Sequence, residues 1–110
     1  MVYLTYQING GMPMKLLTKA NIESLPVMGS TEGQGNQAIA QVKFFTPDSN
    51  WTWYAVEYDQ ENELFYGLVD GFDKELGTFS LAELSTVRGP FGLPIERDRY
   101  FDPTPLFQLY

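Results

Sequence analysis

The sequence predicts an α+β domain, an antiparallel β-meander of about four strands with two short helices packed on it. Between residues 38 and 79, aromatic and β-branched residues are grouped in short segments that turn residues separate. These short connections favour antiparallel neighbours, because parallel strands need long crossovers between them. Short helical patterns stand before and after this region, which places two helices in the same domain as the sheet.

The N-terminal residues read differently from the rest. Residues 1–13 end in a chain-breaking run that contains two glycines and a proline, and Met14 offers a second natural start. We therefore expect residues 1–13 to be an extension and residues 14–110 to be a single domain. The first residues lack both a charged region and a continuous apolar run, so they do not predict a signal peptide.

The first helix is expected over residues 19–25. Thr18 can cap its N-terminus, and Pro26 ends it. A polar loop over residues 29–37 follows, and it leads directly into the strands.

Four strands are expected, over residues 38–45, 51–58, 64–69 and 76–79. The turns between them are rich in Pro, Gly, Asn and Asp. Strict alternation along the second strand places Trp51, Trp53 and Glu57 on one face, and Tyr54 and Tyr58 on the other.

The second helix begins after Ser80, because Ser80 and Glu83 have the spacing of a capping box. Leu81, Leu84 and Val87 are expected to face the sheet. Beyond residue 88 the chain is rich in proline and glycine, which predicts an irregular C-terminal segment. Its expected anchors are Phe91, Leu93, Ile95, Tyr100, Phe101, Leu106 and Phe107.

Composition excludes several chemistries. The 110 residues include no cysteine and no histidine, so disulfides, thiolate metal sites and Ser-His-Asp triads cannot form. Glycosidases and two-metal nucleases need only carboxylates, but no recognisable spacing of acidic residues is present. We expect neither a catalytic residue nor a metal or cofactor.

The charge is strongly acidic. Seven Lys and Arg stand against fourteen Asp and Glu, which gives a net charge of -7. Such a chain is repelled by nucleic-acid phosphates and by anionic lipid, so neither direct nucleic-acid binding nor membrane association is expected. No apolar run approaches the ~20 residues that span a bilayer, and a cytoplasmic protein is expected.

The Gly-rich run STEGQG at residues 30–35 does not match a phosphate-binding motif. It lacks the lysine of a P-loop, and a strand rather than a helix follows it. We expect Gly33 and Gly35 to shape the loop through positive φ. The same loop could present Glu32 and Gln34 to a partner.

The expected partner-binding residues come from three segments. They are Glu32, Gln34, Trp51, Trp53, Glu57, Asp70 and Asp73. Both faces of the second strand carry aromatic rings, so one aromatic set is expected to be incompletely buried. The alternatives are core packing for the rings and solvated turns for the acids.

The segment 88–98 combines glycines and prolines with charges of both signs. Arg88 or Arg97 is expected to pair with a carboxylate and fasten this segment to the sheet. The alternative is a polar site where the segment meets the Glu32 loop. Its members would be Arg88, Glu96, Arg97 and Asp98.

Several motifs together resemble one family. They are STEGQG, KFFTP, NWTWY, the EYD that follows, GLVDGF, ELGTFSLAEL, RGPFGLPIERD and FDPTPL. In this order they are similar to the domain of unknown function 2958 family, from residue 14 to about residue 109. The resemblance implies a bacterial accessory gene, of the kind carried on plasmids, phages and integrative conjugative elements. It transfers no catalytic residues, because the family has no established activity.

We therefore expect a small acidic, non-enzymatic accessory protein of a mobile genetic element that binds a host or element-encoded protein. A defence inhibitor of the anti-CRISPR or anti-restriction type fits the charge, because an acidic protein can complement a basic groove. The alternative is an enzyme or small-ligand binder with a carboxylate and arginine site between residues 30–35 and 88–98. A third possibility is a single-strand nucleic-acid accessory protein, which needs a basic face beside exposed tryptophans. That face would consist of Lys43, Arg88, Arg97 and Arg99.

Overall fold

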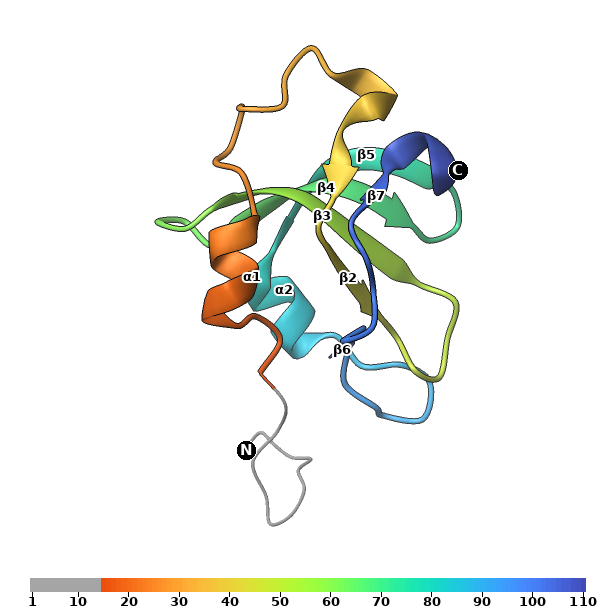
Figure 1. Ribbon diagram of the computed structural model, residues 1–110. Helices are drawn as coiled ribbons and strands as arrows, with labels where there is room; N and C mark the ends of the chain where they lie inside the picture. Colours follow the sequence, from red (N-terminus) through yellow and green to blue (C-terminus); the bar gives the residue numbers. More distant parts are fainter. Residues whose placement is uncertain (1–14) are drawn as a thin grey trace.

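The computed structural model describes residues 15–110, and the expected extension at 1–13 lies outside this range. Five strands form the main sheet in the order β5-β4-β3-β2-β6, and every neighbouring pair is antiparallel (Figure 1). The strands are β2 (Val42–Phe45), β3 (Thr52–Asp59), β4 (Leu64–Asp70), β5 (Lys74–Ser80) and β6 (Glu96–Arg97). The α+β class and the antiparallel meander are confirmed, but the sheet has one strand more than expected.

The additional strand comes from the C-terminal segment, which is less irregular than predicted. β6 pairs with β2 through Phe44↔Arg97 and Phe45↔Glu96. Further on, β7 (Thr104–Pro105) pairs with β1 (Ile39–Ala40) in a separate two-stranded sheet, and a 3-10 turn, η2 (Leu106–Gln108), follows it. Both strands arise from long-range pairing, which local sequence pattern does not reveal.

Both predicted helices form, with reciprocal caps. In α1 (Lys19–Ser24), the Thr18 hydroxyl accepts from the Asn21 N–H at 3.1 Å, and the Asn21 side chain accepts from the Thr18 N–H at 3.0 Å. In α2 (Leu81–Thr86), Ser80 and Glu83 form the predicted capping box at 2.9 and 3.0 Å. No helix within residues 15–110 has the length and apolarity needed to cross a membrane.

Apolar side chains are buried on both faces of the main sheet. On the face that α1 and α2 cover (Figure 1), Phe65 is fully buried, and its ring centroid lies 4.6 Å from Tyr58 and 5.2 Å from Phe79. The opposite face carries a second cluster with Val56 and Leu106. This two-sided burial explains why aromatic rings occur on both faces of β3.

Several predicted apolar anchors are not in the core. Val87 is exposed, because α2 ends at Thr86 and Leu84 is its buried residue. Phe91 and Tyr100 are more than four-fifths exposed, whereas Ile95 and Leu106 are buried as expected. The C-terminal segment is therefore anchored at fewer points than the sequence indicates.

A β-bulge in β3 reverses the alternation of its side chains. Ala55 lies opposite Gly67 and Glu57 lies opposite Tyr66, so Val56 is an inserted residue with no partner. Beyond the bulge, Tyr58 joins the helix-covered face, and Glu57 lies on the other face with Tyr66. The expected placement of Glu57 beside Trp51 and Trp53 is wrong, because one inserted residue changes the parity of every position after it.

Gly67 allows β3 and β4 to approach closely at the bulge. A Cβ atom at this position would lie 1.8 Å from the Tyr54 carbonyl oxygen and 3.2 Å from the Ala55 Cα. Both neighbours are backbone atoms of the paired strand, which cannot move aside without breaking the ladder. The bulge geometry therefore requires glycine at this position.

Candidate functional site

The Gly-rich loop is fastened to the sheet by one buried carboxylate. Glu57 is 3% exposed, and its Oε1 accepts a hydrogen bond from the Gly29 N–H at 2.7 Å. Its Oε2 accepts one from the Thr31 N–H at 2.8 Å and another from the Thr31 hydroxyl. Gly33 and Gly35 have φ values of 90° and 54°, which confirms the positive φ predicted for both. The path of this loop depends on Glu57 and on its glycines.

Hydrogen bonds from the loop stabilise the ionised form of the Glu57 carboxylate and lower its pKa. Burial acts to raise the pKa, but hydrogen bonds from the Thr31 side chain and from the Gly29 and Thr31 N–H groups outweigh burial, so the pKa lies below its usual 4.5. A general acid needs a raised pKa instead. Glu57 was expected to contact a partner, but its side chain is buried and its carboxylate faces the loop.

A hollow of about 410 Å³ lies between this loop and the sheet, and we call it the loop hollow. Its walls include the apolar side chains of Met28, Ala38, Tyr66 and Leu76. Glu32 and Gln34 are exposed on the loop beside it, so the structure leaves both free to contact a partner. The carboxylate of Glu57 lines the hollow but is already bonded to the loop.

Two of the predicted partner-binding residues, Trp51 and Asp73, lie next to Phe72 at the β4–β5 hairpin. Phe72, in the turn, is 94% exposed, and its ring meets Trp51 edge-on with centroids 5.3 Å apart and planes at 81°. Trp51 is half-buried, and its ring lies 5.9 Å from Trp53. Trp53 was also expected to contact a partner, but it is only 8% exposed and packs in the helix-covered core.

Two carboxylates flank these rings. Asp73 and Glu75 join Trp51 and Phe72 in lining a hollow of about 280 Å³, which we call the hairpin hollow. Aromatic faces attract cations through the ring quadrupole, and carboxylates beside them add full negative charge. Asp70 is separated from this group, because it lies opposite Thr52 on the other face of the sheet.

Phe72 and Glu75 are among the residues of the hairpin hollow that sequence reasoning did not identify. A signal for Phe72 was present: a phenylalanine between Gly71 and Asp73 in a tight turn cannot reach the core on either face of the sheet. The role of Thr31 at Glu57 had no local signal, because the two residues meet only through the fold.

The arginines of the predicted polar site bind backbone carbonyls rather than carboxylates. Arg97 donates from Nη1 to the carbonyl oxygens of Lys15, at 2.6 Å, and Leu16, at 3.0 Å. Arg88 donates from Nη1 to the Ser85 and Val87 carbonyls at the end of α2. The expected arginine–carboxylate pair is thus wrong within the described residues, because both guanidinium groups bond backbone carbonyl oxygens there.

The alternative polar site does not assemble next to the Glu32 loop. Arg97 and Asp98 line a separate hollow of about 220 Å³, and Asp98 pairs with Lys43 at 3.7 Å. Burial, and then the charge of Arg99, lowers the pKa of Arg97. Glu96 is in β6 and lies opposite Phe45 of β2. β6 is at the opposite edge of the sheet from β5, whose Leu76 lines the loop hollow. The residues of the carboxylate and arginine site expected between residues 30–35 and 88–98 therefore lie in separate places and do not form one site.

Two of the four residues expected to form a basic face, Lys43 and Arg97, do not share a face of the sheet. Arg97 lies opposite Phe44, and Lys43 alternates with Phe44 along β2, so Lys43 and Arg97 point to opposite faces of the sheet. This arrangement does not provide the basic track that single-strand binding requires.

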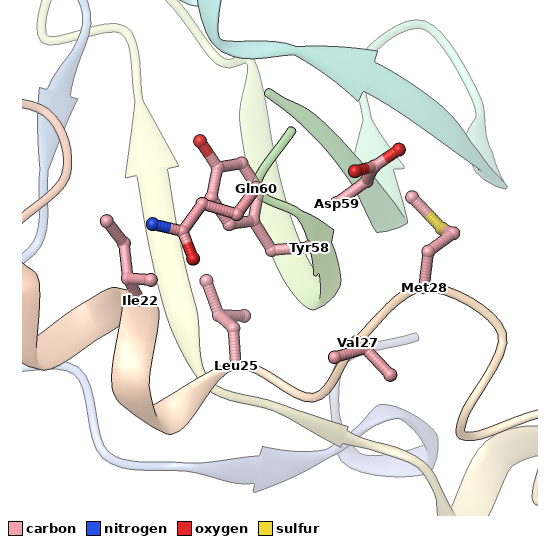
Figure 2. Close-up of a pocket in the computed structure, with 7 residues that line it drawn as sticks. All are labelled: Ile22, Leu25, Val27, Met28, Tyr58, Asp59 and Gln60. Carbon is pink, nitrogen blue, oxygen red and sulfur yellow. The ribbon is translucent and has the colours of Figure 1, made fainter. Parts of the chain in front are cut away.

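Figure 2 shows a further hollow, of about 310 Å³, between α1 and the end of β3. Ile22 of α1 and Leu25, which directly follows α1, reach into it and face Tyr58. Burial, followed by the charges of Glu63 and Asp59, raises the pKa of Tyr58, so its hydroxyl keeps its proton. Asp59 also lines the hollow, and its carboxylate accepts a hydrogen bond from the Asn62 side chain at 2.8 Å. No three acidic side chains in the described part of the chain form a metal-binding group.

The fold and these surfaces define a small acidic α+β domain whose open hairpin combines aromatic rings and carboxylates. A family model described as "Protein of unknown function (DUF2958)" matches residues 16–110, and the chain belongs to this family. The match confirms the resemblance seen in the sequence motifs. Comparison with curated proteins and with solved structures gave no match.

Proposed function

We propose that this protein is a non-enzymatic binding module that holds a partner protein at its β4–β5 hairpin. The observation that carries the proposal is Phe72, a large apolar side chain that is 94% exposed at the tip of a regular hairpin. Exposed aromatic side chains backed by other rings are typical anchors of protein interfaces. Trp51 supports Phe72 from behind in this way.

Charge indicates what the partner offers. Asp73 and Glu75 stand beside the two rings, and the whole chain carries a net charge of -7. A basic surface would be attracted to this end of the molecule and would associate faster at low ionic strength. The site therefore favours a partner that presents lysine or arginine side chains.

The resemblance to the family implies a gene of mobile DNA, and on that ground we propose a host protein or a protein of the same mobile element as the partner. A nuclease of a defence system would fit the charge, since a basic groove complements an acidic protein. The contacts with such a protein would come from Trp51, Phe72, Asp73 and Glu75. Glu32 and Gln34 would add contacts from the neighbouring loop.

The test is affinity capture from a host lysate with wild-type protein and two variants. Phe72→Ser removes the exposed ring, and Tyr100→Ser removes an equally accessible ring, 87% exposed, that lies outside the hairpin. We expect one protein to be captured near stoichiometry by the wild type and by Tyr100→Ser, and to be lost with Phe72→Ser. Capture at about 50 mM salt should be strongly reduced at about 500 mM, since screening weakens surface charge attraction. Binding that ignores both Phe72→Ser and salt would refute the proposal.

A further inference from the structure

β5 is an outer strand of the main sheet and presents an open edge. Its seven register pairs with β4 run from Leu64↔Ser80 to Asp70↔Lys74 without a bulge. Natural edge strands are usually protected by prolines, bulges or outward lysines. β5 contains no proline or bulge, and Lys74 is drawn back, because its Nζ donates to the Leu109 carbonyl at 3.1 Å.

Two hydrogen bonds at the ends of the hairpin establish which backbone groups face outward. The Gly71 N–H donates to the Asp73 carbonyl at 3.1 Å, and the Leu81 N–H donates to the Glu63 carbonyl at 3.0 Å. Hydrogen-bonded positions alternate along an antiparallel pair. The backbone N–H and C=O groups of the odd-numbered residues of β5 therefore bond to β4. Those of the even-numbered residues point outward from the free edge of the sheet.

Lys74, Leu76 and Thr78 consequently direct their N–H and C=O groups outward. No backbone hydrogen bond from elsewhere in residues 15–110 reaches them. These groups form a regular row with the spacing that a further strand would need. Gly77 lies in the middle of this row, and a Cβ atom placed there would have no neighbour within 4 Å.

The open edge lies between the two hollows. Leu76 lines both the hairpin hollow and the loop hollow. The hairpin hollow contains Trp51, Phe72 and two carboxylates, and the loop hollow has mainly apolar walls. An extended chain laid along β5 would pass directly between them.

We propose that β5 receives an extended segment of the partner protein as a sixth strand of the main sheet, an inference that rests on the binding function proposed above. Successive side chains of an added strand point to opposite faces. One set would enter the hairpin hollow, where lysine or arginine would meet the rings and carboxylates. The other set would enter the loop hollow, which suits apolar side chains. The recognised segment thus alternates basic and apolar residues, with backbone bonds for affinity and the hollows for selectivity.

Charge distinguishes a partner segment from a second copy of this chain. Asp73 and Glu75 lie at one end of the edge, and a second copy would bring two more carboxylates to the same pair of strands. Each copy also carries a net charge of -7. A basic strand would relieve this repulsion, whereas a second copy would double it.

The probe is a fluorescein-labelled octapeptide that alternates Arg and Val, titrated onto the full chain by fluorescence anisotropy. A peptide with Glu in place of Arg is the charge control. Thr78→Pro removes one outward N–H group and leaves the β4–β5 bonds intact, and Thr78→Val keeps that N–H group. Loss of one backbone bond with its partner left unpaired should weaken binding of the Arg peptide about tenfold. Thr78→Val should stay within about twofold.

Amide hydrogen exchange gives a second, independent readout. On binding of the Arg peptide, the N–H groups of Leu76 and Thr78 should exchange more slowly, because they become hydrogen-bonded. One set of results refutes the added strand while the proposed function stands. In it, Phe72→Ser abolishes binding, amide exchange at Leu76 and Thr78 does not change on binding, and Thr78→Pro binds the peptide as tightly as the wild type. Absence of Arg-peptide binding also refutes the added strand. A dimer of the chain alone, detected by sedimentation and abolished by Thr78→Pro, would show that a second copy occupies the edge and would overturn the proposal.

Discussion

Replacing Glu57 by glutamine tests whether this carboxylate organises the Gly-rich loop. In the wild type, Oε1 faces the Gly29 N–H at 2.7 Å and Oε2 faces two donors of Thr31. A glutamine side chain has one oxygen and one NH₂ group in the same positions. If its oxygen keeps the Thr31 bonds, its NH₂ group is turned toward the Gly29 N–H, and two donors then oppose each other.

The structure gives the expected magnitude. Hydrogen bonds to a charged group contribute about 1.5–3 kcal/mol each, and a buried donor left unpaired costs about 1–3 kcal/mol. Glu57→Gln loses the charge and one bond, so we expect a loss of about 2–4 kcal/mol in the free energy of unfolding. Such a loss is a large fraction of the roughly 5–15 kcal/mol that stabilises a typical domain.

The assay is denaturant unfolding followed by tryptophan fluorescence, which reports on the buried Trp53. Glu32→Gln is the matched control, because Glu32 is an exposed carboxylate of the same loop and should change stability by less than about 0.5 kcal/mol. Amide exchange at Gly29 and Thr31 should also accelerate in Glu57→Gln. A Glu57→Gln protein within about 0.5 kcal/mol of the wild type would refute the anchoring role.

Three further predictions concern the pKa of Glu57, the close approach of the strands at Gly67 and the hydrogen bonds of Arg97. The folded-state pKa of Glu57 lies below 4.5, so its stabilisation is complete above about pH 5 and is lost as pH falls through the folded pKa; unfolding at pH 3–6 should show a weaker pH dependence in Glu57→Gln. Gly67→Ala should lose at least about 3 kcal/mol or fail to fold, whereas Gly77→Ala, with open space around its Cβ, should keep a near wild-type Tm; equal Tm values would contradict the bulge geometry. Arg97→Met should lose about 1–2 kcal/mol and speed tryptic cleavage near Lys15, and Arg99→Met is its control; unchanged cleavage would show that Arg97 does not hold this segment.

Local sequence signals were sufficient for the elements whose contacts are close along the chain. Thr18 and Ser80 cap helices because their hydroxyls meet N–H groups three residues later. The hairpins formed because their turns carry residues suited to tight reversal. β6 was not predictable in this way, since Glu96 and Arg97 become a strand only by pairing with Phe45 and Phe44.

The candidate site was predictable only in part, for a related reason. Trp51 and Asp73 were identified from composition and turn position, and both line the hairpin hollow. Trp53 and Glu57 were assigned to a partner surface by strict alternation, and both are buried. Burial depends on what covers each face, which the pattern of one strand does not contain.

The sequence by itself determined the two helices, the four strands of the meander, the acidic charge and the absence of cysteine and histidine chemistry. Those properties depend on composition and on neighbours a few residues apart. The tertiary structure decided where Glu57 points and which edge of the sheet is open. One inserted residue at Val56 turned Glu57 toward the Gly-rich loop, because side-chain direction beyond a bulge follows from the register between two strands. β5 likewise remains an edge strand because β6 joins the sheet beside β2 and not beside β5.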